Sequence, residues 1–207
     1  MLIRETSDLE SIRIVHGIRP ELVDEVARLL VEAFARKYEY QLRPRSPEQI
    51  QRLVAGSLTA ELGWVALDEN GTVVAAAGID VPRRRFSHIS YAMLAREFGP
   101  LSAAPRWLFA LLADVFTRPR KREWRVSSIA VSESARGKGV GTRLLSVIVE
   151  AARTAGIRAV TLEVVDVNDG ARRLYERTGF KLVRYLKTGR LTARGGYRGI
   201  RFMRLEL

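Results

Sequence analysis

The sequence has 207 residues, of which 47% are hydrophobic and 28% charged, and its net charge is +12. This size and composition predict a single domain, residues 1–207, with one hydrophobic core. The lack of cysteine excludes disulfides, thiolate metal sites and cysteine nucleophiles, and His16 and His88 are too isolated to predict a metal site. The first ten residues are too polar for a secretory signal, so we expect a cytoplasmic protein.

The first 81 residues carry the patterns of strands and amphipathic helices. Pro20 suits the start of a helix whose apolar residues recur at helical spacing, and Ser46 before Pro47 is typical of a capped helix start. An Asn-Gly pair within Asp68–Gly71 indicates a hairpin turn. We therefore expect a strand over 12–18, helices over 20–34 and 46–58, and paired strands over Trp64–Leu67 and Thr72–Val81.

Residues 83–122 carry no strand pattern and predict a helical insertion. Helices are expected near His88–Phe98 and Pro105–Phe116, separated by Gly99 and Pro100. The second is apolar nearly all round but shorter than the roughly 20 residues that cross a bilayer, so no membrane span is expected. We expect a buried helix packed on the sheet; a lid over a substrate, a homodimer face and an interfacial membrane contact remain alternatives.

The loop Arg136–Gly141, with the sequence RGKGVG, follows an apolar strand that ends near Val131. Glycine lets the backbone approach an anion closely, and the helix expected over Gly141–Ala155 begins with unpaired N–H groups and partial positive charge. The loop is therefore predicted to bind an anion such as a phosphate. Its spacing fits neither a dinucleotide-binding loop nor a P-loop, in which Ser or Thr would follow Lys138.

The remainder of the chain predicts three strands and one short helix. A strand is expected around Thr161–Val164, followed by a short helix that carries Tyr175. The last two strands are expected over Lys181–Lys187 and Gly199–Leu207, joined by a loop rich in glycine and arginine.

Three of these elements, in the same order, resemble the GCN5-related N-acetyltransferase (GNAT) superfamily. Arg136–Gly141 fits the pyrophosphate loop R/Q-x-x-G-x-G/A, and the strand Ser128–Val131 and the pattern from Asn168 to Phe180 fit its flanks. The resemblance is close over 126–180 and absent over 83–122. It implies an α/β (α+β) fold with a mixed central sheet of about seven strands, flanking helices, a splayed cofactor site and the helical insertion as an addition.

The resemblance also implies that acetyl-CoA is the co-substrate. The backbone of Ile129, Ala130 and Val131 would pair with the pantetheine arm, to which Asn168 would hydrogen-bond. Tyr175 would protonate the departing thiolate, although it could instead be an aromatic residue packed on the sheet. The pyrophosphate would be held by the loop residues Arg136, Gly137, Lys138, Gly139, Val140, Gly141 and Thr142.

Glu163 is the candidate general base, because its L-E-V context resembles that of ribosomal-protein alanine N-acetyltransferases. Strand alternation places it opposite Leu162 and Val164, where it could also face solvent or pair with an arginine. Glu123 and a chain of water molecules remain alternatives for the base.

The expected activity is direct transfer of an acetyl group to a primary amine of a small-molecule or peptide acceptor. Two alternatives remain open: a catalytically silent acyl-CoA-binding or regulatory module, and a basic protein associated with the ribosome or RNA. Residues 172–207 contain eleven basic residues and two acidic ones. Because coenzyme A is itself a polyanion, this excess does not by itself predict a nucleic-acid partner.

Overall fold

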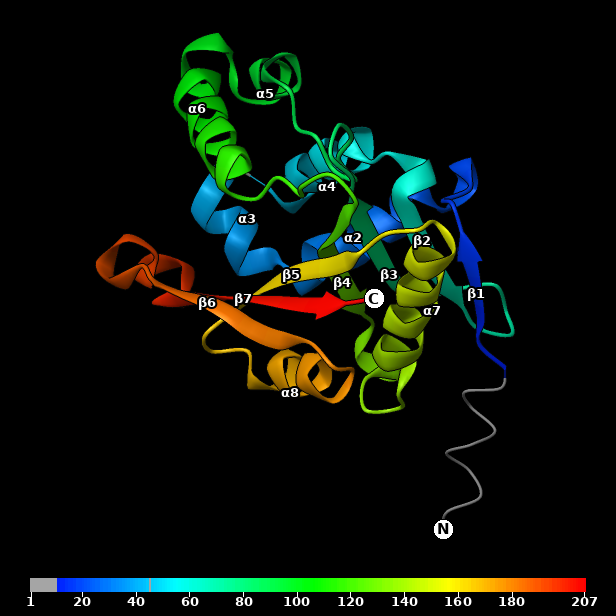
Figure 1. Cartoon of the computed structure of the whole chain (residues 1–207). Helices are drawn as coiled ribbons and strands as arrows, with labels where there is room; N and C mark the ends of the chain where they lie inside the picture. Colours follow the sequence, from blue (N-terminus) through cyan, green and yellow to red (C-terminus); the bar gives the residue numbers. More distant parts are fainter. Residues whose placement is uncertain (1–10, 45) are drawn as a thin grey trace.

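A computed structural model of the chain describes residues 11–44 and 46–207 (Figure 1). Its centre is a mixed seven-stranded sheet in the order β1-β2-β3-β4-β5-β7-β6, which confirms the expected fold class. The β4–β5 pair is parallel and the other neighbouring pairs are antiparallel. The strands are β1 Arg13–His16, β2 Gly63–Leu67, β3 Val73–Asp80, β4 Glu123–Val131, β5 Ala159–Val165, β6 Lys181–Lys187 and β7 Gly199–Glu206.

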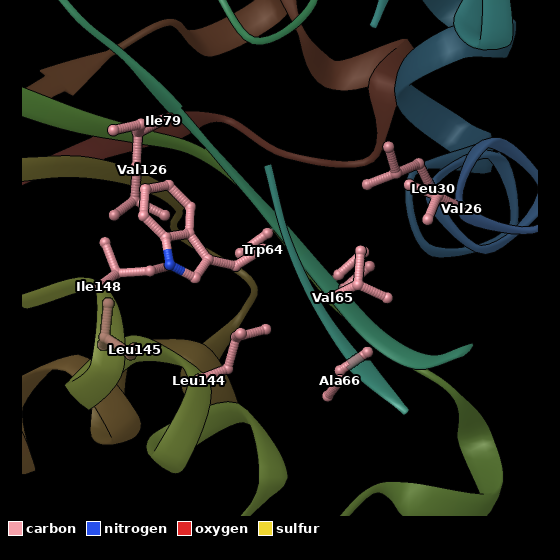
Figure 2. Close-up of a cluster of buried hydrophobic side chains, with 14 of the residues drawn as sticks. Val26, Leu30, Trp64, Val65, Ala66, Ile79, Val126, Leu144, Leu145 and Ile148 are labelled. Carbon is pink, nitrogen blue, oxygen red and sulfur yellow. The ribbon is translucent and has the colours of Figure 1, made fainter. Parts of the chain in front are cut away.

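Helices cover both faces of the sheet. Figure 2 shows α2 residues Val26 and Leu30 on one side of β2 and α7 residues Leu144 and Ile148 on the other. Because helices cover both faces, every residue of β2 and β3 is buried, and the sequences of both strands are almost entirely apolar. The α-helices are α2 Val23–Ala33, α3 Ala35–Leu42, α4 Pro47–Ser57, α5 Tyr91–Phe98, α6 Pro100–Phe116, α7 Val140–Thr154 and α8 Asp169–Arg177.

The expected helix over 20–34 is present but is followed by a helix that the sequence did not reveal. A 3-10 turn, η1 Pro20–Leu22, leads into α2, and the backbone leaves the helical region at Phe34, with φ −117° and ψ 24°. The chain then resumes as α3, which ends at Arg43 in the left-handed conformation. Polar residues dominate α3, so its apolar periodicity is weak.

The cap and the hairpin form as predicted. The Ser46 hydroxyl accepts a hydrogen bond from the Gln49 amide at 3.4 Å and caps α4. In the β2–β3 turn, the Asp68 carboxylate accepts hydrogen bonds from the amides of Asn70 and Thr72 at 3.0 and 2.8 Å. Gly71 takes a φ of +80°, which a side chain would disfavour.

The insertion contains two helices, but the second differs from its prediction in start and environment. Gly99, with φ +84°, ends α5, and α6 begins at Pro100 rather than Pro105. Pro105 therefore lies inside α6, where it removes one backbone hydrogen bond. The expectation of a buried helix on the sheet is wrong: α6 packs on α5 and touches α3 (Figure 1), while Leu108 and Phe109 are 52% and 45% exposed.

Candidate active site

The central feature of the site is the separation of β4 from β5. Their parallel pairing runs only from Glu123–Ala159 to Val126–Leu162. Beyond Val126, β4 continues to Val131 beside β3, and β5 continues to Val165 beside β7. The segment that contains Ile129, Ala130 and Val131 therefore has no β5 partner on one side. A separated strand of this kind can pair its backbone with an extended ligand.

A buried hydroxyl lies at the start of this separated segment. The Ser128 Oγ is shielded from solvent and has no hydrogen-bond partner among the residues that the structure describes. Its neighbour Ser127, at an irregularity in the β3–β4 register, donates a hydrogen bond to the Gly78 carbonyl at 3.2 Å. Buried polar groups normally have partners, so the Ser128 hydroxyl is suited to a water molecule or a bound ligand.

The glycine loop lies between the end of β4 and the start of α7. Gly137 and Gly139 have φ values of +77° and +79°, and Gly139 caps α7. The Arg136 guanidinium donates a hydrogen bond to the Val131 carbonyl at 3.2 Å, which joins the loop to the end of β4. The amides of the first helical turn lack intrahelical acceptors, so this end of α7 suits an anion.

A side chain at position 141 would be a tight fit. A Cβ there would lie 3.3 Å from Val131 Cγ2 and 3.5 Å from Leu174 Cδ1, so α7 passes close to β4 and α8. Val140 is 1% exposed, whereas Lys138 is exposed. Val140 and Gly141 can therefore offer a ligand backbone groups, while Lys138 can also offer its charge.

Asn168 and Tyr175 lie at the two ends of one short helix. The Asn168 side-chain oxygen accepts a hydrogen bond from the Ala171 amide at 3.0 Å and caps α8. The cap leaves the amide nitrogen as the side-chain atom that can donate to a ligand. Tyr175 is 6% exposed and packs beside Phe180, and burial raises the pKa of its phenol to about 12.

A network of buried charges crosses the sheet where β4 and β5 separate. Arg125 contacts the Asp80 carboxylate at 2.7 Å and both carboxylate oxygens of Glu163 at 3.1 Å. The exposed fractions of the Asp80, Arg125 and Glu163 side chains are 2%, 14% and 23%. Glu163 thus pairs with an arginine, one of the arrangements expected from its strand position, and retains partial access to solvent.

Further charged groups surround this network. The Arg85 guanidinium contacts Asp80 at 2.7 Å. Burial alone would raise the pKa of Asp80, but the charge of Arg125 and the hydrogen bonds from Phe86, Arg125 and Arg85 lower it below its usual value. Lys37 on α3 is exposed as a residue, but desolvation around its ammonium lowers the pKa of that group and Arg125 lowers it further, while Glu163 and Asp80 act in the opposite direction.

Glu123, the alternative base, lies away from the separated segment. It is the first residue of β4, within the paired region, and its carboxylate is bound by the Arg204 guanidinium and by the Arg120 amide. Burial would raise the pKa of Glu123, but these contacts hold it below its usual value. The geometry therefore favours Glu163 over Glu123 as a group near the opening.

The sequence interpretation missed Asp80 and the pairing role of Arg125. A signal was present, because three neighbouring apolar strands each carry a charged residue: Asp80 at the end of β3, Arg125 near the start of β4 and Glu163 in the second half of β5. Sequence position alone does not show that Asp80 lies opposite Arg125 in the β3–β4 register, or that Glu163 reaches the same guanidinium.

The chain matches a known family over most of its length. Residues 23–180, which include the glycine loop and the helix with Tyr175, match the model of the Acetyltransferase (GNAT) family. The chain belongs to this family. Within the part of the GNAT chain that the structure describes, no helix is both long and apolar enough to cross a membrane.

Individual relatives are similar over shorter stretches of sequence. YycN of Bacillus subtilis, an uncharacterized N-acetyltransferase, is 39% identical over 61 residues, which make up 30% of this chain and 39% of YycN. The alignments to curated relatives cover between 20% and 39% of those proteins. Sequence similarity to curated proteins is therefore confined to a part of each.

Solved structures match the fold as a whole. A GCN5-related N-acetyltransferase from Kribbella flavida has a TM-score of 0.62 at 20% identity, over 96% of this chain and 99% of that protein. A ribosomal-protein alanine N-acetyltransferase from Escherichia coli has a TM-score of 0.58 at 17% identity, over 94% and 93% of the two chains. At these identities the similarity shows the GNAT fold.

The charge network makes stability depend on pH through Asp80. Because the pKa of Asp80 is lower in the folded than in the unfolded chain, its contribution is complete above about pH 4 and is lost as pH falls through the folded value. Asp80→Asn should lower the free energy of unfolding at pH 7 by about 3 kcal/mol, because two guanidinium groups lose their buried partner.

This prediction is checked by urea unfolding at pH 7 and at about pH 3.5. The free energy of unfolding of the wild type should be lower at about pH 3.5 than at pH 7. This difference between the two pH values should be smaller in Asp80→Asn. Glu69→Gln, a matched change in the exposed β2–β3 turn, should leave both stabilities nearly unchanged. Equal stabilities of Asp80→Asn and the wild type at pH 7 would contradict the role given to Asp80.

Proposed function

We propose that this protein is an acetyl-CoA-dependent N-acetyltransferase that transfers the acetyl group directly to a primary amine. The observation that carries the proposal is the separation of β4 and β5 beside the glycine loop. One end of this opening offers unpaired strand backbone, and the other offers the amides at the start of α7. An extended arm that ends in a pyrophosphate has the shape and charge that such an arrangement accepts.

In this proposal the cofactor is held mainly by the backbone. Ile129, Ala130 and Val131 pair with the pantetheine arm, and Asn168 donates its side-chain amide to the same arm. The loop from Arg136 to Thr142 binds the pyrophosphate. An open hollow runs along α7 from Thr142, at the end of the loop, and is lined in part by Arg143, Arg153, Arg177 and Glu150. Its net positive charge suits a polyanion, although Glu150 pairs with Arg153.

Two side chains would move protons in the reaction. The acceptor amine must lose a proton before or as it attacks the thioester carbonyl, and Glu163 is the proposed base. Arg125 keeps this carboxylate in place through hydrogen bonds to both of its oxygens. Tyr175 is the proposed acid, because burial keeps its phenol protonated and able to donate to the coenzyme A thiolate. Backbone amides near Val131 would polarise the carbonyl.

Acetyl transfer should be detectable as release of free thiol from acetyl-CoA in the presence of an amine. A panel of peptide N-termini, lysine side chains, polyamines, aminoglycosides and small amino compounds covers the chemical range of acceptors. Turnover with at least one of these classes is expected. Tight acetyl-CoA binding without thiol release in any class would instead indicate a silent acyl-CoA-binding module. Failure to bind acetyl-CoA would contradict the proposal.

The loop assignment predicts a specific loss of cofactor binding in Gly139→Glu. The new carboxylate would crowd and repel the pyrophosphate, so acetyl-CoA binding measured by calorimetry should weaken by on the order of 100-fold. Gly156→Glu is the matched control, because Gly156 also has a positive φ (+66°) but follows the other end of α7. Equal loss of affinity in both variants would refute the loop assignment.

The proposed acid and base predict different kinetic defects. Tyr175→Phe should lower kcat about 100-fold with little change in acetyl-CoA affinity, because the phenyl ring preserves the packing. The pKa of about 12 also implies that rates in the wild type do not fall through loss of this proton below about pH 11. Glu163→Gln should lower kcat most at low pH, because fewer acceptor amines have already lost their proton there and the reaction depends more on a base. Unchanged kcat in Tyr175→Phe would exclude the role of acid.

A further inference from the structure

Helix α6 exposes an almost uncharged apolar surface to solvent. We define the α6 surface as six residues from α5 and α6 whose exposed fractions lie between 38% and 92%. Between Pro100 and Leu111, one residue is buried, Ala103, and one residue is charged, Arg106. The members of the α6 surface are Tyr91, Leu101, Trp107, Leu108, Phe109 and Leu111.

The charge of Arg106 is directed inward and does not interrupt this surface. Its guanidinium donates hydrogen bonds to the carbonyls of Leu42 and Ser102 at 2.7 Å and lies 4.4 Å from the centre of the Phe98 ring. These contacts fix α6 to α3 and α5. The helix is therefore held in place by Arg106 while the large apolar side chains of the α6 surface remain uncovered.

Exposed basic residues lie on the segments next to the α6 surface. The residues directly after α6 include four exposed basic side chains, and Arg43 and Arg96 are exposed on the neighbouring α3 cap and α5. Residues 83–122 contain nine arginines and lysines but two acidic residues, of which Glu97 is paired with Arg52 and Arg96. The basic residues after α6 are Arg118, Arg120, Lys121 and Arg122.

Shape, composition and charge together point to one occupant. We propose that the α6 surface binds the interface of an anionic lipid membrane, without crossing it. The helix projects from the body of the molecule (Figure 1), so it is suited to enter a soft interface rather than to receive a partner in a groove. The side chains of the α6 surface are hydrocarbon and aromatic, and basic residues on the neighbouring segments attract anionic headgroups.

Charge disfavours the other obvious occupant, a second copy of this chain. A symmetric contact through α6 would place the same patch on both sides of the interface. The exposed basic residues after α6 would then face their own copies, in a protein of net charge +12. The α6 helix has 17 residues, about 25 Å in length, which matches contact along the interface and is shorter than a membrane span.

The membrane proposal can be tested without knowledge of the acyl acceptor. The 207-residue chain is floated with vesicles of phosphatidylcholine alone or with about 30% phosphatidylglycerol. Binding to the anionic vesicles should be at least about tenfold tighter and should weaken as salt is raised. Emission from the exposed Trp107 should shift to shorter wavelength on binding, and Trp107→Phe should remove most of that shift.

A matched pair of double variants isolates the α6 surface. Leu108→Asp with Phe109→Asp should lower binding to the anionic vesicles by at least about tenfold. Leu182→Asp with Val183→Asp, which changes residues of 55% and 59% exposure on β6, should leave binding unchanged. Circular dichroism and acetyl-CoA binding report whether each variant is folded.

Three results would overturn the proposal. The first is no binding to anionic vesicles at low salt, and the second is equal loss in the α6 and β6 variants. The third is a dimer, detected by light scattering, that the α6 variant dissociates while neither protein binds vesicles; a second copy would then cover the helix. None of these results bears on acetyl transfer, so the proposal stands or falls separately from the proposed function.

Discussion

The separation of β4 and β5 after Val126 is the constraint on which the site depends. A parallel pair that continued to the strand ends would satisfy its own backbone groups and leave no room between the strands. Here each strand keeps a different partner, β3 for β4 and β7 for β5, so both remain ordered after they part. The unpaired edge of β4 is thus held rigidly beside the glycine loop. The backbone N–H and C=O groups along that edge need hydrogen bonds from water or a ligand.

The same separation explains the need for the charge network. Arg125 lies in the last paired stretch, between Asp80 on one neighbouring strand and Glu163 on the other. Removing one buried partner would leave uncompensated charge, so the three side chains fix one another's positions. Glu163 is thereby oriented at the point where the strands part. In the proposed mechanism, structural support and chemistry therefore share residues, and a change at Asp80 is expected to affect both.

The predictability of each element follows how local its cause is. The Ser46 cap, the Asp68–Gly71 turn and the glycine loop depend on residues a few positions apart, and the structure contains all three near their predicted places. The break at Phe34 and the helix α3 were missed, because nothing local distinguishes them from a continuing helix or a loop. The start of α6 was placed five residues late, because Pro105 was interpreted as a helix start although it lies inside the helix.

The sequence by itself determined the glycine loop and the family resemblance, because these depend on strand and helix patterns and on glycine at fixed spacing. The mixed sheet followed as what that resemblance implies, and anion binding by the loop remains a prediction. The tertiary structure decided where β4 and β5 part and that Asp80, Arg125 and Glu163 meet, since strand register joins residues up to 83 positions apart. It also decided that α6 is exposed. An apolar helix sequence is compatible both with burial inside the protein and with contact with another apolar phase. Only the packing of the helix in the folded chain distinguishes these two environments.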